Sequence, residues 1–177
     1  YFYCCDKELD GIRLQVTYCN LETEEINLSM NPEIPDDCDL LFLYAPTSDI
    51  TDDEKTIIEK YLSDGGKVYL ILGDTTSDTP NLDGIMSDYG LKKVSGYIAD
   101  TQRCYQGNYY AIFPQLSLSG DLGSGISNQM VLLLNSPGME KTDTDNDNLT
   151  VTPFMQTSDS GYAVTENDQT QGQYILG

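Results

Sequence analysis

The sequence contains no histidine and no tryptophan. Histidine is the usual general base near neutral pH and a common metal ligand, so its absence excludes Ser-His-Asp and Cys-His catalysis within this chain, together with histidine-based zinc sites. Without tryptophan there is no indole platform for a sugar ring, which argues against glycoside cleavage by paired carboxylates. The chain is therefore not expected to be an enzyme, and a hydrolase that uses carboxylates or a metal is only a third hypothesis.

Basic residues are also scarce, because Lys and Arg total 9 against 29 Asp and Glu, which gives a net charge of −20. A surface with this charge repels phosphate backbones and anionic lipid headgroups, so nucleic acid is excluded as an expected partner. Net charge bears on solubility more than on fold or site, and solubility is the simplest interpretation of the acidity.

Five cysteines are present, an odd number, and no C-x-x-C pair occurs among them. A structural zinc site normally shows ligand pairs two to four residues apart, whereas the first two cysteines here are adjacent. The sequence thus predicts no metal and no cofactor. Free, mostly buried thiols are favoured over one or two disulfides, and the pairing stays open. The five are Cys4, Cys5, Cys19, Cys38 and Cys104.

Long hydrophobic runs are missing as well. No apolar stretch reaches the ~18 residues that a membrane helix needs, and no charged start followed by an apolar segment marks a signal peptide. The chain begins at Tyr1 and ends on the apolar run 174–176, without an initiator methionine, as an excised fragment would. We therefore expect anchoring segments to lie outside it.

The clearest pattern in the chain is a strand, a helix and a second strand joined by short loops. Apolar runs at 39–44 and 67–72 have the length of strands buried on both faces. Between them, Thr51-Asp52-Asp53-Glu54 is a capping box, apolar residues recur at helical spacing, and Gly65-Gly66 ends the helix, which is expected at about 51–64. Units of this kind are almost always parallel and right-handed.

A second round predicts a helix at 80–89 and a third strand at 94–99. Together these elements predict an α/β fold with a mainly parallel sheet and an irregular, β-rich C-terminal part. The length suits a single α/β domain spanning 1–177. Its parts are an N-terminal segment of uncertain connectivity at 1–34, a βαβαβ core at 35–100 and the β-rich part at 101–177.

The C-terminal part alternates weaker strand patterns with polar loops. Strands are expected at 109–113 and 130–134, and weaker ones at 149–152 and 174–176. An aromatic group lies around the first of them, and strand and core packing is favoured over a contact patch for it. The group consists of Tyr105, Tyr109, Tyr110 and Phe113.

The loops that follow the two buried strands provide the candidate ligand site. In an open parallel sheet, ligands bind beyond the carboxyl ends of the strands. The loops at 45–49 and 73–77 hold hydroxyl and carboxylate side chains that suit a polar ligand, although such residues are also ordinary loop and cap residues. The predicted site residues are Thr47, Ser48, Asp74 and Thr75.

Three further patterns do not reach the standard of a site. The run 143–148 resembles the start of a calcium loop, but it has Asn148 where glycine is needed and Phe154 where glutamate is needed. The glycine-rich run 120–125 does not match a phosphate-binding fingerprint. No S-x-x-K motif supports a Ser–Lys nucleophile.

Five stretches, taken in order, resemble the auxiliary extracytoplasmic domain of bacterial ABC transport systems of the gliding-motility type, the GldG-like family. The run from Tyr61 to Lys67, which reads Y-L-S-D-G-G-K, belongs to one of them, and the order and spacing of all five carry the likeness. They cover most of 35–177. The stretches are 35–46, 51–67, 80–91, 149–154 with Thr157-Ser158, and 172–176.

The resemblance implies a flavodoxin-like or glutamine-amidotransferase-like sheet without amidotransferase chemistry. It also implies a cell-membrane protein whose domain faces the extracytoplasmic side, with an ABC permease and an ATPase as partners and an unknown oligomeric state. The chain departs from the family at its start, because a parallel crossover of a dozen or more residues does not fit before the strand expected at Leu14. The leading hypothesis is an accessory domain for protein interaction or ligand sensing. The alternative is a secreted or surface module that binds a small molecule or glycan.

Overall fold

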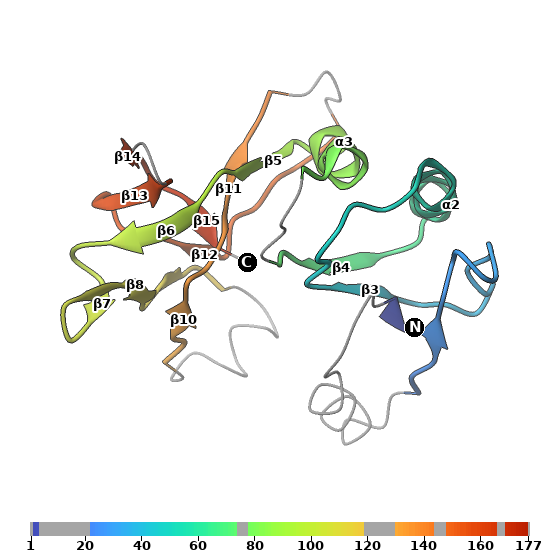
Figure 1. Ribbon diagram of the computed structural model, residues 1–177, viewed down its shortest axis with the longest axis horizontal. Helices are drawn as coiled ribbons and strands as arrows, with labels where there is room; N and C mark the ends of the chain where they lie inside the picture. Colours follow the sequence, from blue (N-terminus) through green and yellow to red (C-terminus); the bar gives the residue numbers. More distant parts are fainter. Residues whose placement is uncertain are drawn as a thin grey trace. The chain divides into compact units, whose positions relative to one another are not determined.

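The computed structural model describes residues 2–3, 22–73, 78–118, 130–143, 148–165 and 169–176. The chain divides into two compact units, residues 1–85 and 86–177 (Figure 1). The expectation of one domain for the whole chain stays a prediction.

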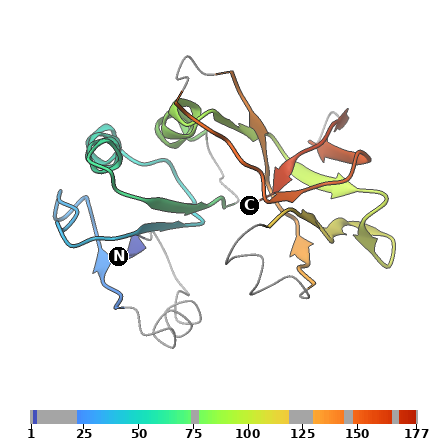
Figure 2. The same cartoon turned by 180° about the vertical axis from the view of Figure 1, so that it is seen from behind.

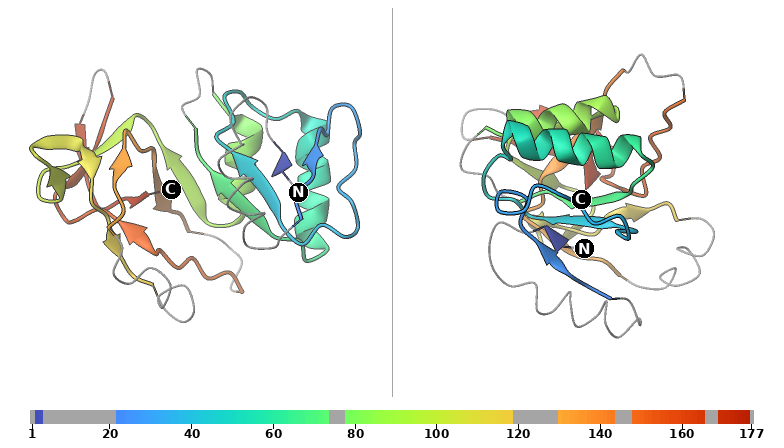
Figure 3. Two further views of the ribbon diagram at one scale, coloured as in Figure 1. Left: turned by 90° about the horizontal axis from the view of Figure 1, so that it is seen from below. Right: turned by 90° about the vertical axis from the view of Figure 1, so that its right-hand side faces the viewer.

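The N-terminal unit is built on a parallel sheet. Its strands are β1 (Phe2–Tyr3), β2 (Glu25–Ile26), β3 (Leu41–Tyr44) and β4 (Val68–Ile71). They stand in the order β2-β1-β3-β4, and every neighbouring pair is parallel (Figure 2). Helix α2 (Asp52–Ser63) connects β3 to β4, which confirms the predicted strand–helix–strand unit. Helix α3 (Pro80–Asp88) begins in this unit, and the two helices lie on the same face of the sheet (Figure 3).

Local signals fix both ends of α2. The Thr51 hydroxyl accepts a hydrogen bond from the Glu54 N–H at 3.2 Å, and the Glu54 carboxylate accepts one from the Thr51 N–H at 2.8 Å. At the other end, Gly65 adopts a φ of 95°, a conformation that glycine takes without the steric cost of a Cβ atom. The predicted capping box and glycine stop are therefore confirmed.

The core of the N-terminal unit lies between the sheet and the helices. Leu41 and Leu43 alternate along β3 with half-buried neighbours, so their side chains share one face of the sheet. They cluster with Ile58 of α2 and with Leu82 and Ile85 of α3. Since Leu41 and Ile58 are fully buried, the packing of α2 on β3 is the centre of this unit.

The C-terminal unit consists of short strands in three antiparallel sheets. The sheet orders are β10-β8-β7, β5-β11-β15-β12-β9 and β14-β13-β6. A core of buried aliphatic and aromatic side chains includes Ile98, Ile112 and Tyr174. The strands are β5 (Leu91–Val94), β6 (Tyr97–Asp100), β7 (Cys104–Tyr105), β8 (Asn108–Ile112), β9 (Gln115–Leu116), β10 (Leu133–Leu134), β11 (Gly138–Lys141), β12 (Met155–Gln156), β13 (Gly161–Val164), β14 (Gln169–Gln171) and β15 (Ile175–Leu176).

The prediction of a mainly parallel, flavodoxin-like or glutamine-amidotransferase-like sheet is wrong. Among the strands of the described residues, those of the four-stranded sheet of the N-terminal unit pair in parallel, and the pairs of the other three sheets are antiparallel. The strand expected at 94–99 is interrupted at Gly96, so that β5 pairs with β11 and β6 pairs with β13. A further strand parallel to β4 could be reached only through a crossover connection. In contrast, a two-residue turn at Gln106-Gly107 joins β7 to β8, and such a short turn makes the two strands antiparallel.

Thr51→Ala should lower the free energy of unfolding by about 1 kcal/mol, because it removes the hydroxyl that caps α2. Thr56→Ala is the matched control, since Thr56 is exposed in the middle of the same helix and alanine favours helix formation there. Urea denaturation of both variants and of the wild type measures the change in the free energy of unfolding. Equal stabilities would show that the capping box does not hold the start of α2.

Candidate functional site

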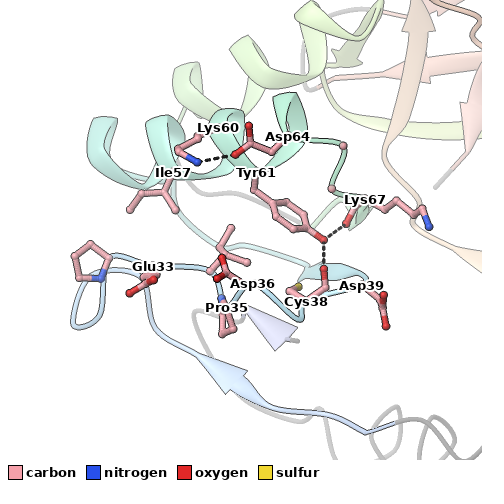
Figure 4. A pocket seen from close by; sticks show the side chains of 14 residues that line it. Glu33, Pro35, Asp36, Cys38, Asp39, Ile57, Lys60, Tyr61, Asp64 and Lys67 are labelled. Atoms are coloured by element: carbon pink, nitrogen blue, oxygen red, sulfur yellow. Dashed lines mark hydrogen bonds and ion pairs between the residues drawn. The ribbon is translucent and has the colours of Figure 1, made fainter.

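A pocket of about 530 Å³ lies in the N-terminal unit, beside the ends at which β3 and β4 begin (Figure 4). Its wall is formed by the loop that precedes β3, the last turns of α2 and the turn that leads into β4. The lining residues are Pro32, Glu33, Ile34, Pro35, Asp36, Cys38, Asp39, Ile57, Lys60, Tyr61, Asp64, Gly65, Gly66 and Lys67. The pocket therefore joins three segments that are separated in the sequence.

Tyr61 holds the two walls of the pocket together. Its hydroxyl donates to the carbonyl oxygen of Cys38 at 3.0 Å, with the carbonyl of Lys67 at 3.3 Å (Figure 4). Its ring lies against Gly66, where an added Cβ atom would come within 2.4 Å of the ring. Burial raises the pKa of Tyr61, and the neighbouring Cys38 raises it further. The phenol is thus a protonated structural bridge near neutral pH.

Charged groups of both signs surround the opening. Lys60 forms an ion pair with Asp64, with 2.6 Å between Nζ and Oδ2, and the hydrogen bond to Asp64 raises the pKa of Lys60. Asp36 acts on Lys60 in the same direction. The carboxylates of Glu33 and Asp39 also line the pocket. This arrangement is suited to binding a polar ligand through ion pairs and hydrogen bonds.

The pocket lies at the opposite end of β3 and β4 from the predicted ligand site. Thr47 and Ser48 are exposed in the loop after β3, whereas Asp74 and Thr75 lie outside the described residues. The two loops do meet, because an added Cβ atom at Gly73 would come within 2.8 Å of the Ala45 backbone. The four-residue site stays a prediction.

Asp49, in the loop after β3, has a structural role. Its carboxylate accepts hydrogen bonds from the backbone N–H groups of Asn81 at 2.9 Å and Leu82 at 3.0 Å. These groups belong to the first turn of α3, where a negative charge also suits the helix dipole. Asp49 therefore fixes the position of α3 within the N-terminal unit.

Asp100 is the most deeply buried carboxylate of the C-terminal unit among the described residues, and its hydrogen bonds are satisfied within the fold. Oδ1 accepts from the N–H groups of Gln102 and Arg103, both at 2.9 Å, and from the Ser158 hydroxyl at 2.8 Å. Oδ2 accepts from the Ser158 N–H at 2.7 Å. Burial alone would raise the pKa of Asp100, but these hydrogen bonds together hold it below its usual value.

One protein family matches most of the chain at the level of sequence. Its description is "ABC-type uncharacterized transport system", and its sequence model matches residues 15–174. The chain belongs to this family. As a member of this family, the protein is an auxiliary component of an ABC-type transport system and is associated with such a system, as the sequence resemblance implied.

A solved structure titled "mmIFT52 N-terminal domain" has a similar fold. The TM-score is 0.63 at 12% sequence identity, and the similarity covers 97% of this chain and 88% of that one. At this identity the likeness concerns the fold alone. No curated protein sequence matches this member of the transport-system family.

Several of the other candidate residues in the sequence lie outside the part of the chain that the structure describes. The run 120–125 lies outside the described residues, as do 144–147 of the calcium-loop pattern and Cys4, Cys5 and Cys19. Cys38 and Cys104 are free thiols. Across the described ranges, no group of three or more Cys, Asp or Glu side chains is placed to hold a metal ion, and no helix is long and apolar enough to span a membrane.

The aromatic group was expected to pack in strands and core. Tyr105, Tyr109 and Tyr110 do lie in β7 and β8, but two members of the group are outside the buried core. Tyr105 and Tyr109 are each 45% exposed, whereas Tyr110 and Phe113 are half-buried. The pocket residues themselves were missed as a site. The signal in the sequence was the Y-L-S-D-G-G-K run, which was interpreted as a helix stop and as part of the family resemblance.

Tyr61→Phe should lower the free energy of unfolding by about 1 kcal/mol, because two carbonyl oxygens lose their shared hydroxyl donor while the ring is kept. Tyr69→Phe is the control, because Tyr69 is 47% exposed and its ring stacks on Phe42 with or without the hydroxyl. Thermal and urea unfolding of both variants test this expectation. A loss for Tyr69→Phe as large as for Tyr61→Phe would contradict the bridging role.

Asp100→Asn should cost about 1–3 kcal/mol at neutral pH, because an amide cannot accept all four hydrogen bonds. Since the pKa of Asp100 is lowered in the folded state, the unfolded chain takes up this proton first as the pH falls. The stabilisation is complete above about pH 4 and is lost as the pH falls further toward the folded-state pKa.

Urea denaturation at pH 7 and pH 3 measures this effect. The wild type should lose more stability than Asp100→Asn over this interval, so that the two curves converge at low pH. Asp159→Asn, which changes an exposed carboxylate beside Ser158, is the control and should follow the wild type. Parallel curves for the wild type and Asp100→Asn would refute the assignment.

Proposed function

We propose that the chain is a non-catalytic, extracytoplasmic accessory domain of a bacterial ABC transport system, where it works with a permease and an ATPase in protein interaction or ligand sensing. The observation that carries the proposal is the family match over residues 15–174. Membership of the family supports the association with a transport system. The permease and the ATPase as partners, and the outward orientation of the domain, are proposed in addition.

The placement of polar groups supports a non-catalytic role. A catalytic acid or base needs a side chain that is free to exchange a proton with a substrate. In the described residues, Tyr61, Asp49 and Asp100 instead use their polar atoms to hold loops and helices in place. No histidine is present anywhere in the chain to supply a base.

A surface module that binds a small molecule is the second candidate, and the pocket beside Tyr61 favours it. Its volume of about 530 Å³ lies in the range of small-molecule sites. The ion pair of Lys60 with Asp64 and the further carboxylates at its opening would select a polar ligand with a positive group. Within a transport system, the same pocket would serve ligand sensing, so the second candidate differs from the first in its lack of transport partners.

Purification of the tagged full-length protein from its native membrane in mild detergent separates the two candidates. We expect a permease and an ATPase to be recovered in amounts comparable to the tagged protein, as quantitative mass spectrometry would show. Recovery of the protein free of transport subunits would refute the accessory role and leave the ligand-binding module. A tagged, unrelated membrane protein of similar abundance controls for nonspecific recovery.

A further inference from the structure

Charge is distributed unevenly along this acidic chain. Of its 29 acidic residues, 19 lie in residues 1–85, and residues 101–139 contain only one, Asp121, which lies outside the described residues. The single basic residue in the same interval is Arg103, whose guanidinium donates to the carbonyl oxygens of Phe113 and Pro114. A nearly uncharged region therefore exists in a molecule with a net charge of −20.

The sheet β10-β8-β7 lies within this region of the sequence (Figure 1). Ile112 pairs with Leu133, and both belong to the core of the C-terminal unit. Leu134 pairs with Ala111, so both side chains lie on the opposite face, where the small Ala111 is buried but Leu134 is exposed. Tyr109 is two residues from Ala111 along β8 and is 45% exposed, and we call the face of Leu134 and Tyr109 the outward face.

Two further contacts extend this outward face. The ring of Tyr105 meets the ring of Phe113 edge-to-face, with 6.0 Å between centroids, which places Tyr105 on the same side. Along the segment that enters β10, exposed Met130, Leu132 and Leu134 alternate with half-buried residues. We name this surface the neutral strip, and it consists of Tyr105, Tyr109, Phe113, Met130, Leu132 and Leu134.

The neutral strip is exposed and continues into a pocket. Leu134 is 64% exposed and Met130 is 85% exposed. A pocket of about 480 Å³ beside the strip is lined by the apolar residues Phe113, Pro114, Leu116, Met130 and Val131 and by Gln102, Arg103 and Cys104. An apolar strip with an adjoining pocket offers a partner both a flat contact area and a place for an anchoring side chain.

We infer that the neutral strip is the docking surface for an uncharged, aliphatic-rich extended segment of a protein subunit of the transport system. The inference rests on the proposed function, whose protein partners it locates on this chain. Protein interfaces are depleted of charge at their centre and enriched in aromatic residues and methionine, as the strip is. Because β10 is an edge strand among the described strands, the segment adds as a further strand beside it.

Charge decides between this occupant and two others. A second copy of the chain also carries a net charge of −20, so two copies repel each other as they approach. An anionic membrane surface is repelled for the same reason. A neutral apolar segment of another protein meets neither obstacle, because it does not bring a second acidic surface against this one.

The test compares two methionines that are almost equally exposed. Met130 lies in the neutral strip and is 85% exposed, whereas Met30 lies in the N-terminal unit and is 84% exposed. Met130→Glu and Leu134→Glu should each reduce the recovery of transport subunits with the full-length protein at least about tenfold, as loss of an interface anchor does. Met30→Glu should leave recovery unchanged. Thermal unfolding of each purified variant shows that the fold is retained.

Photo-crosslinking identifies the occupant directly in the native membrane. A photoreactive amino acid at position 134 or 109 should crosslink to an uncharged segment of a transport subunit, and the same group at Tyr69 in the N-terminal unit should not. Crosslinks to a second copy or to lipid alone would overturn the inference, as would unchanged recovery with both strip variants. If the docking inference fails in one of these ways, recovery of the transport subunits with the wild-type protein still supports the proposed function. If the wild-type protein itself recovers no transport subunits, the proposed function and the docking inference are both refuted.

Discussion

The structure depends on carboxylates that accept hydrogen bonds from backbone N–H groups. The carboxylate of Asp49 accepts a hydrogen bond from the first turn of α3, and that of Glu54 accepts one at the start of α2. The carboxylate of Asp100 accepts one from the N–H group of Ser158. A carboxylate that is removed from water is costly unless such donors replace the water. In a chain with three times as many acidic as basic residues, this interaction stabilises loops that could not all be held by ion pairs.

The same excess of acid explains why the neutral strip is informative. Most of the acidic residues belong to the sequence of the N-terminal unit, where even the pocket beside Tyr61 has carboxylates at its opening. The sheet that holds β8 and β10, with the segment that leads into β10, departs from this pattern and exposes leucine, methionine and tyrosine. A contiguous group of exposed apolar side chains is typical of a surface that a partner covers. The polar pocket and the neutral strip are thus two chemically different surfaces.

Helices α2 and α3 could be predicted because their signals are local. Thr51 and Glu54 are three residues apart, and Gly65 follows the last turn directly, so each contact forms within one helical turn. The pocket could not be predicted in this way, because Tyr61 reaches the carbonyl of Cys38, 23 residues earlier in the chain. Asp49 lies in the loop 45–49 that was predicted to bind a polar ligand. Its structural role could not be predicted, because its partners in α3 lie more than thirty residues further along the chain.

The sequence by itself determined the two helices, the unit of β3, α2 and β4, the acidity and the family, because these follow from short-range patterns and from the order of motifs. Only the tertiary structure decided that the strands after α3 are antiparallel. Apolar runs such as 130–134 and 94–99 look alike in either kind of sheet, and the direction of pairing depends on partners far along the chain, such as β11 for β5 and β13 for β6. Which faces of those strands stay exposed depends on the same distant partners.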